Sequence, residues 1–78
     1  MFEYEICNVF DEDLFKKQCE ALEKYIPQIK KTDYLEDVDG SQIQLFSVSS
    51  KSEIKVINDV CFGISIESEI DLKPFFND

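Results

Sequence analysis

The sequence predicts a small α+β domain in which one amphipathic helix packs on a mainly antiparallel sheet, with elements in the order β-α-β-β-β before a C-terminal tail. Two kinds of pattern support this fold class: period-two alternation of apolar residues at the N-terminus and in the second half, and a helical stripe between them. The 78 residues suffice for one domain, residues 1–78, and 44% apolar content is too high for a disordered chain.

The first third of the chain predicts a strand and then a helix. Residues Phe2 to Val9 alternate as in a strand with one buried face, and Asp11 is expected to cap the helix N-terminus. The helix carries apolar residues at spacings of three and four, namely Phe15, Cys19, Leu22, Ile26 and Ile29. Pro27 predicts that the helix ends or kinks, with residues 28–31 left as an alternative continuation.

The remainder is expected to form the rest of the sheet. Residues Thr32 to Ser41 hold four acids, no base and a closing glycine, and we expect an acidic connection there. A strand follows over Gln42 to Ser49. A hairpin then pairs Glu53 to Ile57 with Cys61 to Glu67.

The register of this hairpin depends on its loop. A three-residue loop over residues 58–60 would place Val56 opposite Phe62 and Ile54 opposite Ile64 on one face, which we prefer to a two-residue turn. The tail is expected to add a short edge strand or to wrap the core.

The net charge of the chain indicates which kind of partner it can bind. Seventeen Asp and Glu against eight basic residues, all of them Lys, leave a formal net charge of -9. From Thr32 onward ten acids face three lysines, so the excess lies in the second half. An anionic surface without arginine repels nucleic acid and anionic lipid, so we expect neither as a partner and instead expect a protein with a basic surface.

The sequence has few of the residues and motifs that catalytic or metal-binding sites require. The chain has no histidine, no Gly-x-Ser-x-Gly elbow and two glycines, so we expect no enzyme activity and no cofactor. Asp37-Val38-Asp39-Gly40 resembles part of a calcium loop, but its register puts Leu35 and Phe46 at required carboxylate positions, so we expect no metal site. Three separated cysteines and no secretory pattern at the N-terminus predict a cytoplasmic protein with buried thiols.

Acidic and aromatic residues of the second half are the candidate partner-binding residues. They are Asp33, Tyr34, Glu36, Asp37, Asp39, Glu67, Glu69, Asp71, Phe75 and Phe76. Adjacent aromatics in an extended tail cannot easily face one core, so one of them could be exposed beside the carboxylates as an interface anchor. For the two phenylalanines we prefer a core or edge-strand role to that alternative. The competing interpretation of the acids is that they only keep the surface soluble.

Two classes of function fit these features. The first is a small inhibitor, an immunity protein or antitoxin, which neutralises a nuclease-like toxin by presenting an anionic surface to its basic site. The second is a structural or assembly subunit that self-associates, or docks into a larger complex, through a sheet edge or the tail. The sequence favours the first because it lacks catalytic groups and is strongly acidic.

Overall fold

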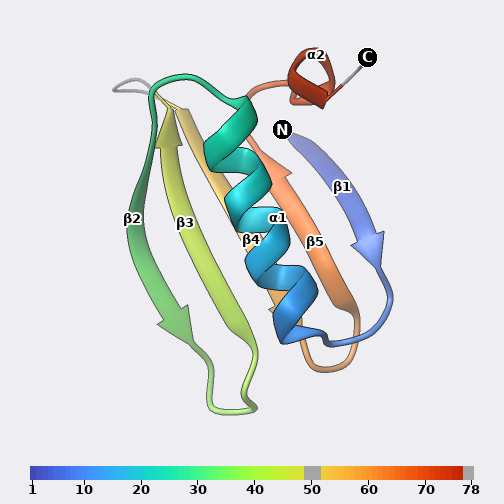
Figure 1. Cartoon of the computed structure of the whole chain (residues 1–78). Helices are drawn as coiled ribbons and strands as arrows, with labels where there is room; N and C mark the ends of the chain where they lie inside the picture. The colour runs from blue at the N-terminus through green and yellow to red at the C-terminus, as the bar shows by residue number, and fades with distance from the viewer. Residues whose placement is uncertain (49–51, 77–78) are drawn as a thin grey trace.

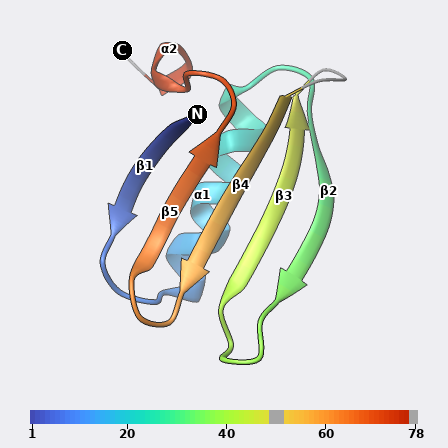
Figure 2. The same ribbon diagram turned by 180° about the vertical axis from the view of Figure 1, so that it is seen from behind.

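A computed structural model describes residues 1–48 and 52–76 and confirms the α+β fold class. The elements are β1 (Phe2–Cys7), α1 (Glu12–Tyr25), β2 (Ile29–Glu36), β3 (Gln42–Val48), β4 (Ser52–Asp59), β5 (Gly63–Ser68) and α2 (Lys73–Phe76). The five strands form one antiparallel sheet in the order β1-β5-β4-β3-β2. Helix α1 covers one face of this sheet, and the view from behind shows the other face without a covering element (Figures 1 and 2).

Helix α1 begins and ends where the sequence predicts. The Asp11 side chain accepts a hydrogen bond from the Leu14 amide at 3.0 Å, and the C-cap residue Ile26 is already extended before Pro27. Gln28 then adopts a positive φ of 63°, which turns the chain back toward the sheet. The alternative continuation of the helix over residues 28–31 is therefore wrong.

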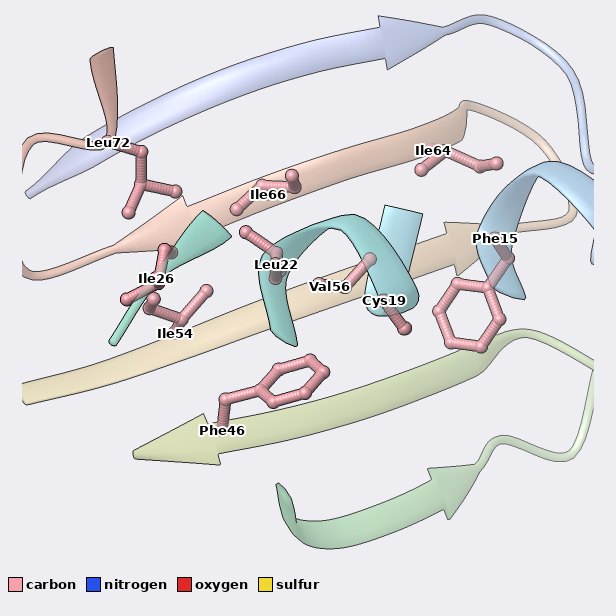
Figure 3. Close-up of a cluster of buried hydrophobic side chains, with 10 residues drawn as sticks. All are labelled: Phe15, Cys19, Leu22, Ile26, Phe46, Ile54, Val56, Ile64, Ile66 and Leu72. Atoms are coloured by element: carbon pink, nitrogen blue, oxygen red, sulfur yellow. The ribbon is translucent and has the colours of Figure 1, made fainter. Parts of the chain in front are cut away.

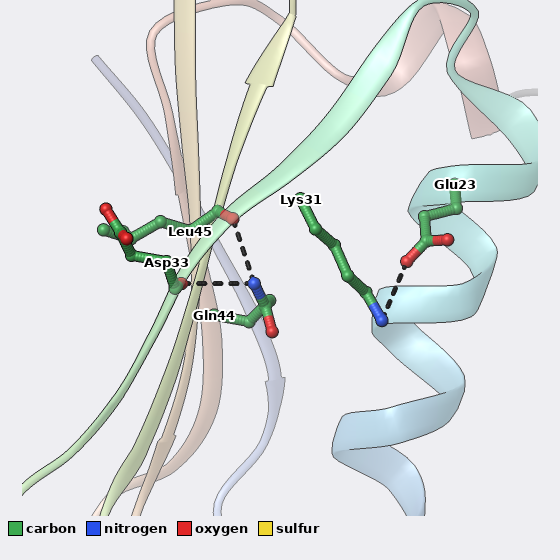
Figure 4. Close-up of polar contacts among 5 residues, drawn as sticks. All are labelled: Glu23, Lys31, Asp33, Gln44 and Leu45. Carbon is green, nitrogen blue, oxygen red and sulfur yellow. Dashed lines mark hydrogen bonds and ion pairs between the residues drawn. The ribbon is translucent and has the colours of Figure 1, made fainter.

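The acidic connection predicted over Thr32 to Ser41 is wrong in its first half, because residues 32–36 belong to edge strand β2 and only residues 37–41 form a connection. Seven of the eight β2 residues are exposed, so the strand carries no alternation of buried and polar residues. Its register shifts between Lys31 and Tyr34, and the buried Gln44 side chain donates to the Asp33 and Leu45 carbonyl groups at 3.1 Å each (Figure 4). An ion pair of 3.2 Å from Lys31 to Glu23 links β2 to α1.

The core lies between α1 and the sheet. Its buried hydrophobic members are Phe15, Cys19, Leu22, Ile26, Phe46, Ile54, Val56, Ile64, Ile66 and Leu72 (Figure 3). Four of the five residues of the predicted helical stripe are in this set, and the fifth, Ile29, packs against it from β2. Phe75 is partly buried against the same core from α2, and the side chain of Phe76 lies outside the described residues.

The β4–β5 hairpin differs from its predicted register. Val56 lies opposite Ile66 and Ile54 opposite Ser68, so the loop has three residues as predicted but spans 60–62. Gly63 follows the loop with a φ of 86°. The Asp59 carboxylate accepts hydrogen bonds from the Cys61 amide at 2.8 Å and the Phe62 amide at 3.0 Å. A left-handed residue is common where a short hairpin loop rejoins its strand, and glycine adopts this conformation without a steric penalty.

Candidate partner-binding surface

Three connections converge at one end of the sheet, the lower end in Figure 1. They are residues 8–11 between β1 and α1, residues 37–41 between β2 and β3, and residues 60–62 between β4 and β5. We call these loops and the residues beside them, 8–13, 36–41 and 59–62, the acidic loop end. Its acids are Asp11, Glu12, Asp13, Glu36, Asp37, Asp39 and Asp59. These segments contain no lysine, and the nearest lysines in sequence are Lys16 and Lys17, one helical turn after Glu12 and Asp13.

Apolar side chains project from the same loops. Val38 and Phe62 are almost fully exposed, at 103% and 82%, and Val9 and Val60 are also exposed. Large exposed apolar groups surrounded by charges are a typical composition for a protein interface, in which an aromatic anchor fills a pocket inside a polar rim. The acidic loop end therefore carries exposed apolar side chains together with carboxylates, which we call its anionic rim.

Buried polar contacts tie the three loops together. The fully buried Asn58 side chain accepts a hydrogen bond from the Asp11 amide at 3.2 Å and donates one to Gln42 Oε1 at 2.9 Å. Ser41 Oγ accepts from the Val60 amide at 3.1 Å. A buried amide that lost these hydrogen bonds would have no water to replace them, which would raise the free energy of the folded state. The contacts therefore hold the loops in one arrangement.

The contacts continue from Gln42 to the β2 edge. Gln42 Nε2 donates to the Tyr34 hydroxyl at 3.0 Å, and that hydroxyl donates to Glu36 Oε1 at 2.8 Å. Desolvation and the hydrogen bond to Glu36 raise the pKa of Tyr34, which keeps its hydroxyl a neutral donor. The Ser41 amide lowers the pKa of Asp39, so this carboxylate remains charged even in mild acid.

The sequence-predicted binding residues do not form one surface. Five of them lie along β2 and the loop that follows it: Asp33, Tyr34, Glu36, Asp37 and Asp39. Glu67, Glu69 and Asp71 lie toward the opposite end, because antiparallel β5 runs away from the acidic loop end.

At that opposite end the carboxylates accept hydrogen bonds from the local backbone. Glu69 accepts from the Glu53 amide at 2.7 Å. Asp71 accepts from the Lys73 amide at 3.0 Å and from the Tyr4 hydroxyl at 2.9 Å, contacts that lower the pKa of Asp71. These contacts hold the C-terminal tail against β1.

Sequence reasoning missed the contribution of the β4–β5 loop. Asp59, Val60 and Phe62 were assigned to the hairpin turn or to the core, whereas all three belong to the acidic loop end. The sequence does hold one indication of this loop, which is the pair Asp59 and Gly63. An aspartate that can cap a turn, followed by a glycine that can adopt a positive φ, is typical of a short hairpin loop.

Cysteine reactivity provides a direct check of this geometry. The prediction of buried thiols is wrong for Cys61, which is exposed in the β4–β5 loop, whereas Cys19 is buried on the face of α1 that packs on the sheet. Burial raises the pKa of the Cys19 thiol to about 11. Because the thiolate is the reacting species, we expect iodoacetamide at about pH 8 to modify Cys61 rapidly and Cys19 only after unfolding. Peptide mass spectrometry measures both rates, and equal rates in the folded protein would contradict the described loop.

Within residues 1–48 and 52–76, the structure places no three Cys, Asp or Glu side chains suitably to hold a metal ion. In the same part of the chain no helix has the length and apolar character needed to cross a membrane. No protein-family model matches this chain, and no curated protein or solved structure matches it either.

Proposed function

We propose that this protein is a small inhibitor of the immunity-protein or antitoxin class, which neutralises a nuclease-like toxin by covering its basic site. One observation carries the proposal: three separate loops bring acids and exposed apolar side chains to one end of the sheet, without a lysine among them. The carboxylates would occupy the positions that substrate phosphates take on a basic surface.

The hydrogen bonds beneath the loops support this use of the surface. Binding costs less conformational entropy when the contacting groups are already held in place, and Asn58 and Ser41 hold all three loops. The anionic rim would accelerate encounter with a cationic partner, and Phe62 would supply the apolar anchor.

The edges of the sheet favour this proposal over the assembly alternative. Both edge strands are irregular, with register shifts between Glu5 and Cys7 in β1 and between Lys31 and Tyr34 in β2. Bulges and charged side chains on edge strands interrupt the regular ladder that a second strand would need. Edge-to-edge self-association is thus disfavoured at both sides of the sheet.

The proposal is tested by two variants that carry the same change in charge. In the first, Asp37, Asp39 and Asp59 are each replaced by Asn, which removes three charges and retains an oxygen that accepts the turn hydrogen bonds. The matched control carries Glu20→Gln, Glu69→Gln and Asp71→Asn, with the same loss of charge outside the acidic loop end.

Each tagged protein is used to capture partners from extracts of its own organism, at low salt and at about 0.1 M salt, where screening limits electrostatic contact to about 10 Å. We expect the wild type and the control to retain a basic protein, and the Asp→Asn variant to lose it. The retained protein should also protect Cys61 from iodoacetamide and should lose its toxic activity when bound. Capture that is equal for both variants, or indifferent to salt, would exclude the proposed mechanism.

A further inference from the structure

The sheet face opposite α1, which we call the open face, carries an apolar stripe. Strand alternation directs to this face the residues between the buried core positions of β3 and β4. In the register, Leu35 of β2 lies opposite Ile43 of β3, and Ile43 lies opposite Ile57 of β4. Leu45 extends the stripe along β3, and Leu35 is 50% exposed. No helix or strand of the described residues lies over this face in the view from behind (Figure 2), and Ile43, Leu45 and Ile57 are half-buried.

The open face is acidic on its other side. Across the strands, Ile57 of β4 lies opposite Ser65 of β5, which in turn lies opposite Glu5 of β1. In the next row of residues on this face, Glu67 of β5 lies opposite Glu3 of β1. Like charges directly opposite each other are destabilising, and the single lysine in that row, Lys55, lies 4.0 Å from Glu67. An open groove of about 610 Å³ runs along these two strands and reaches Phe62.

We propose that the open face docks an amphipathic helix of the partner, with its apolar side on the β2–β4 stripe and basic residues along the flank that faces β5 and β1. Three strands span about 10 Å from first to last, which matches the diameter of a helix. Cationic side chains on that flank would relieve the repulsion between Glu3 and Glu67. The inference takes the basic character of the partner from the proposed function. It concerns the open face, whereas the proposed function concerns the acidic loop end.

The probe is a synthetic leucine–lysine peptide of about 18 residues, patterned as an amphipathic helix of about five turns. A leucine–glutamate peptide of the same pattern is its control. The test variant carries Ile43→Thr and Ile57→Thr, since threonine keeps the β-branched shape and strand propensity while it removes apolar surface. The matched variant carries Phe2→Thr and Tyr25→Thr, two exposed residues that belong neither to the open face nor to the acidic loop end.

Fluorescence anisotropy of the labelled peptide measures affinity for each protein. We expect the wild type and the Phe2/Tyr25 variant to bind the leucine–lysine peptide equally. The Ile43/Ile57 variant should bind it at least about tenfold more weakly, and none should bind the leucine–glutamate peptide.

Three results would overturn the inference: no binding by the wild type, an unchanged affinity for the Ile43/Ile57 variant, or an equal loss of affinity for the Phe2/Tyr25 variant. Capture of the natural partner by the acidic loop end is measured separately, so the proposed function would stand if only the peptide result failed.

Discussion

Replacing Gly63 by alanine is expected to lower the free energy of unfolding by about 3 kcal/mol or more. A Cβ atom at this position would lie 2.4 Å from the Cys7 carbonyl oxygen and 2.5 Å from the Asn8 carbonyl carbon and the Val9 nitrogen. All three are backbone atoms, so no side chain can rotate away to make room. The φ of 86° adds a left-handed conformation that alanine adopts at a cost of about 1–2 kcal/mol.

This loss is large for a chain of 78 residues, whose total stability is expected to be about 4–12 kcal/mol. Urea unfolding followed by circular dichroism measures it. Gly40→Ala is the matched control, because Gly40 has a similar φ of 92° but a Cβ there would meet only Val60 Cγ1, at an ordinary 3.9 Å. The control should lose only the conformational cost of about 1–2 kcal/mol. Equal unfolding midpoints for the two variants would show that the contact with residues 7–9 is unimportant.

The parts of the fold that bury a regular pattern could be predicted from the sequence. Helix α1 presents apolar residues at helical spacing, its first turn is capped by Asp11, and Pro27 follows its end. Each of these features acts within a few residues, and the residues concerned determine the outcome with little help from the rest of the chain. The predicted fold class follows from this helix and from the alternating segments around it.

The parts that depend on distant contacts could not be predicted. Strand β2 pairs with β3 at one edge and is exposed on both faces, so its residues show no alternation from which a strand could be inferred. In the β4–β5 hairpin, alternating residues fit more than one register, and the choice is made by Gly63, whose close approach to the backbone of residues 7–9 requires the absence of a side chain.

The same distinction applies to the candidate surface. Asp37 and Asp39 were predicted because acids before a glycine indicate an exposed turn, and this reasoning needs only local sequence. Their association with Asp59 and Phe62 depends on the sheet order, which places the β2–β3 and β4–β5 loops at one end, and on the hydrogen bond from Val60 to Ser41. Neither can be inferred without the pairing of all five strands.

Phe62 offers the sharpest test of how the acidic loop end works, because its contribution to binding can be separated from its contribution to folding. Its side chain is 82% exposed and makes no part of the buried core, so Phe62→Ala should change the free energy of unfolding by less than about 0.5 kcal/mol. An aromatic anchor at the centre of an interface contributes about 2 kcal/mol or more, so affinity for the captured partner should fall about 30-fold or more.

Phe2→Ala is the matched control, since Phe2 is also exposed, at 43%, but begins β1 at the end of the sheet away from the loops. Calorimetric titration of the purified partner into each variant gives the affinities, and urea unfolding gives the stabilities. A loss of affinity for Phe62→Ala that persists at high salt would identify an apolar contact, because the carboxylates of the rim remain in place and only their attraction is screened. An unchanged affinity, or an equal loss for both variants, would leave the interface without its proposed anchor and would restrict binding to the charges alone.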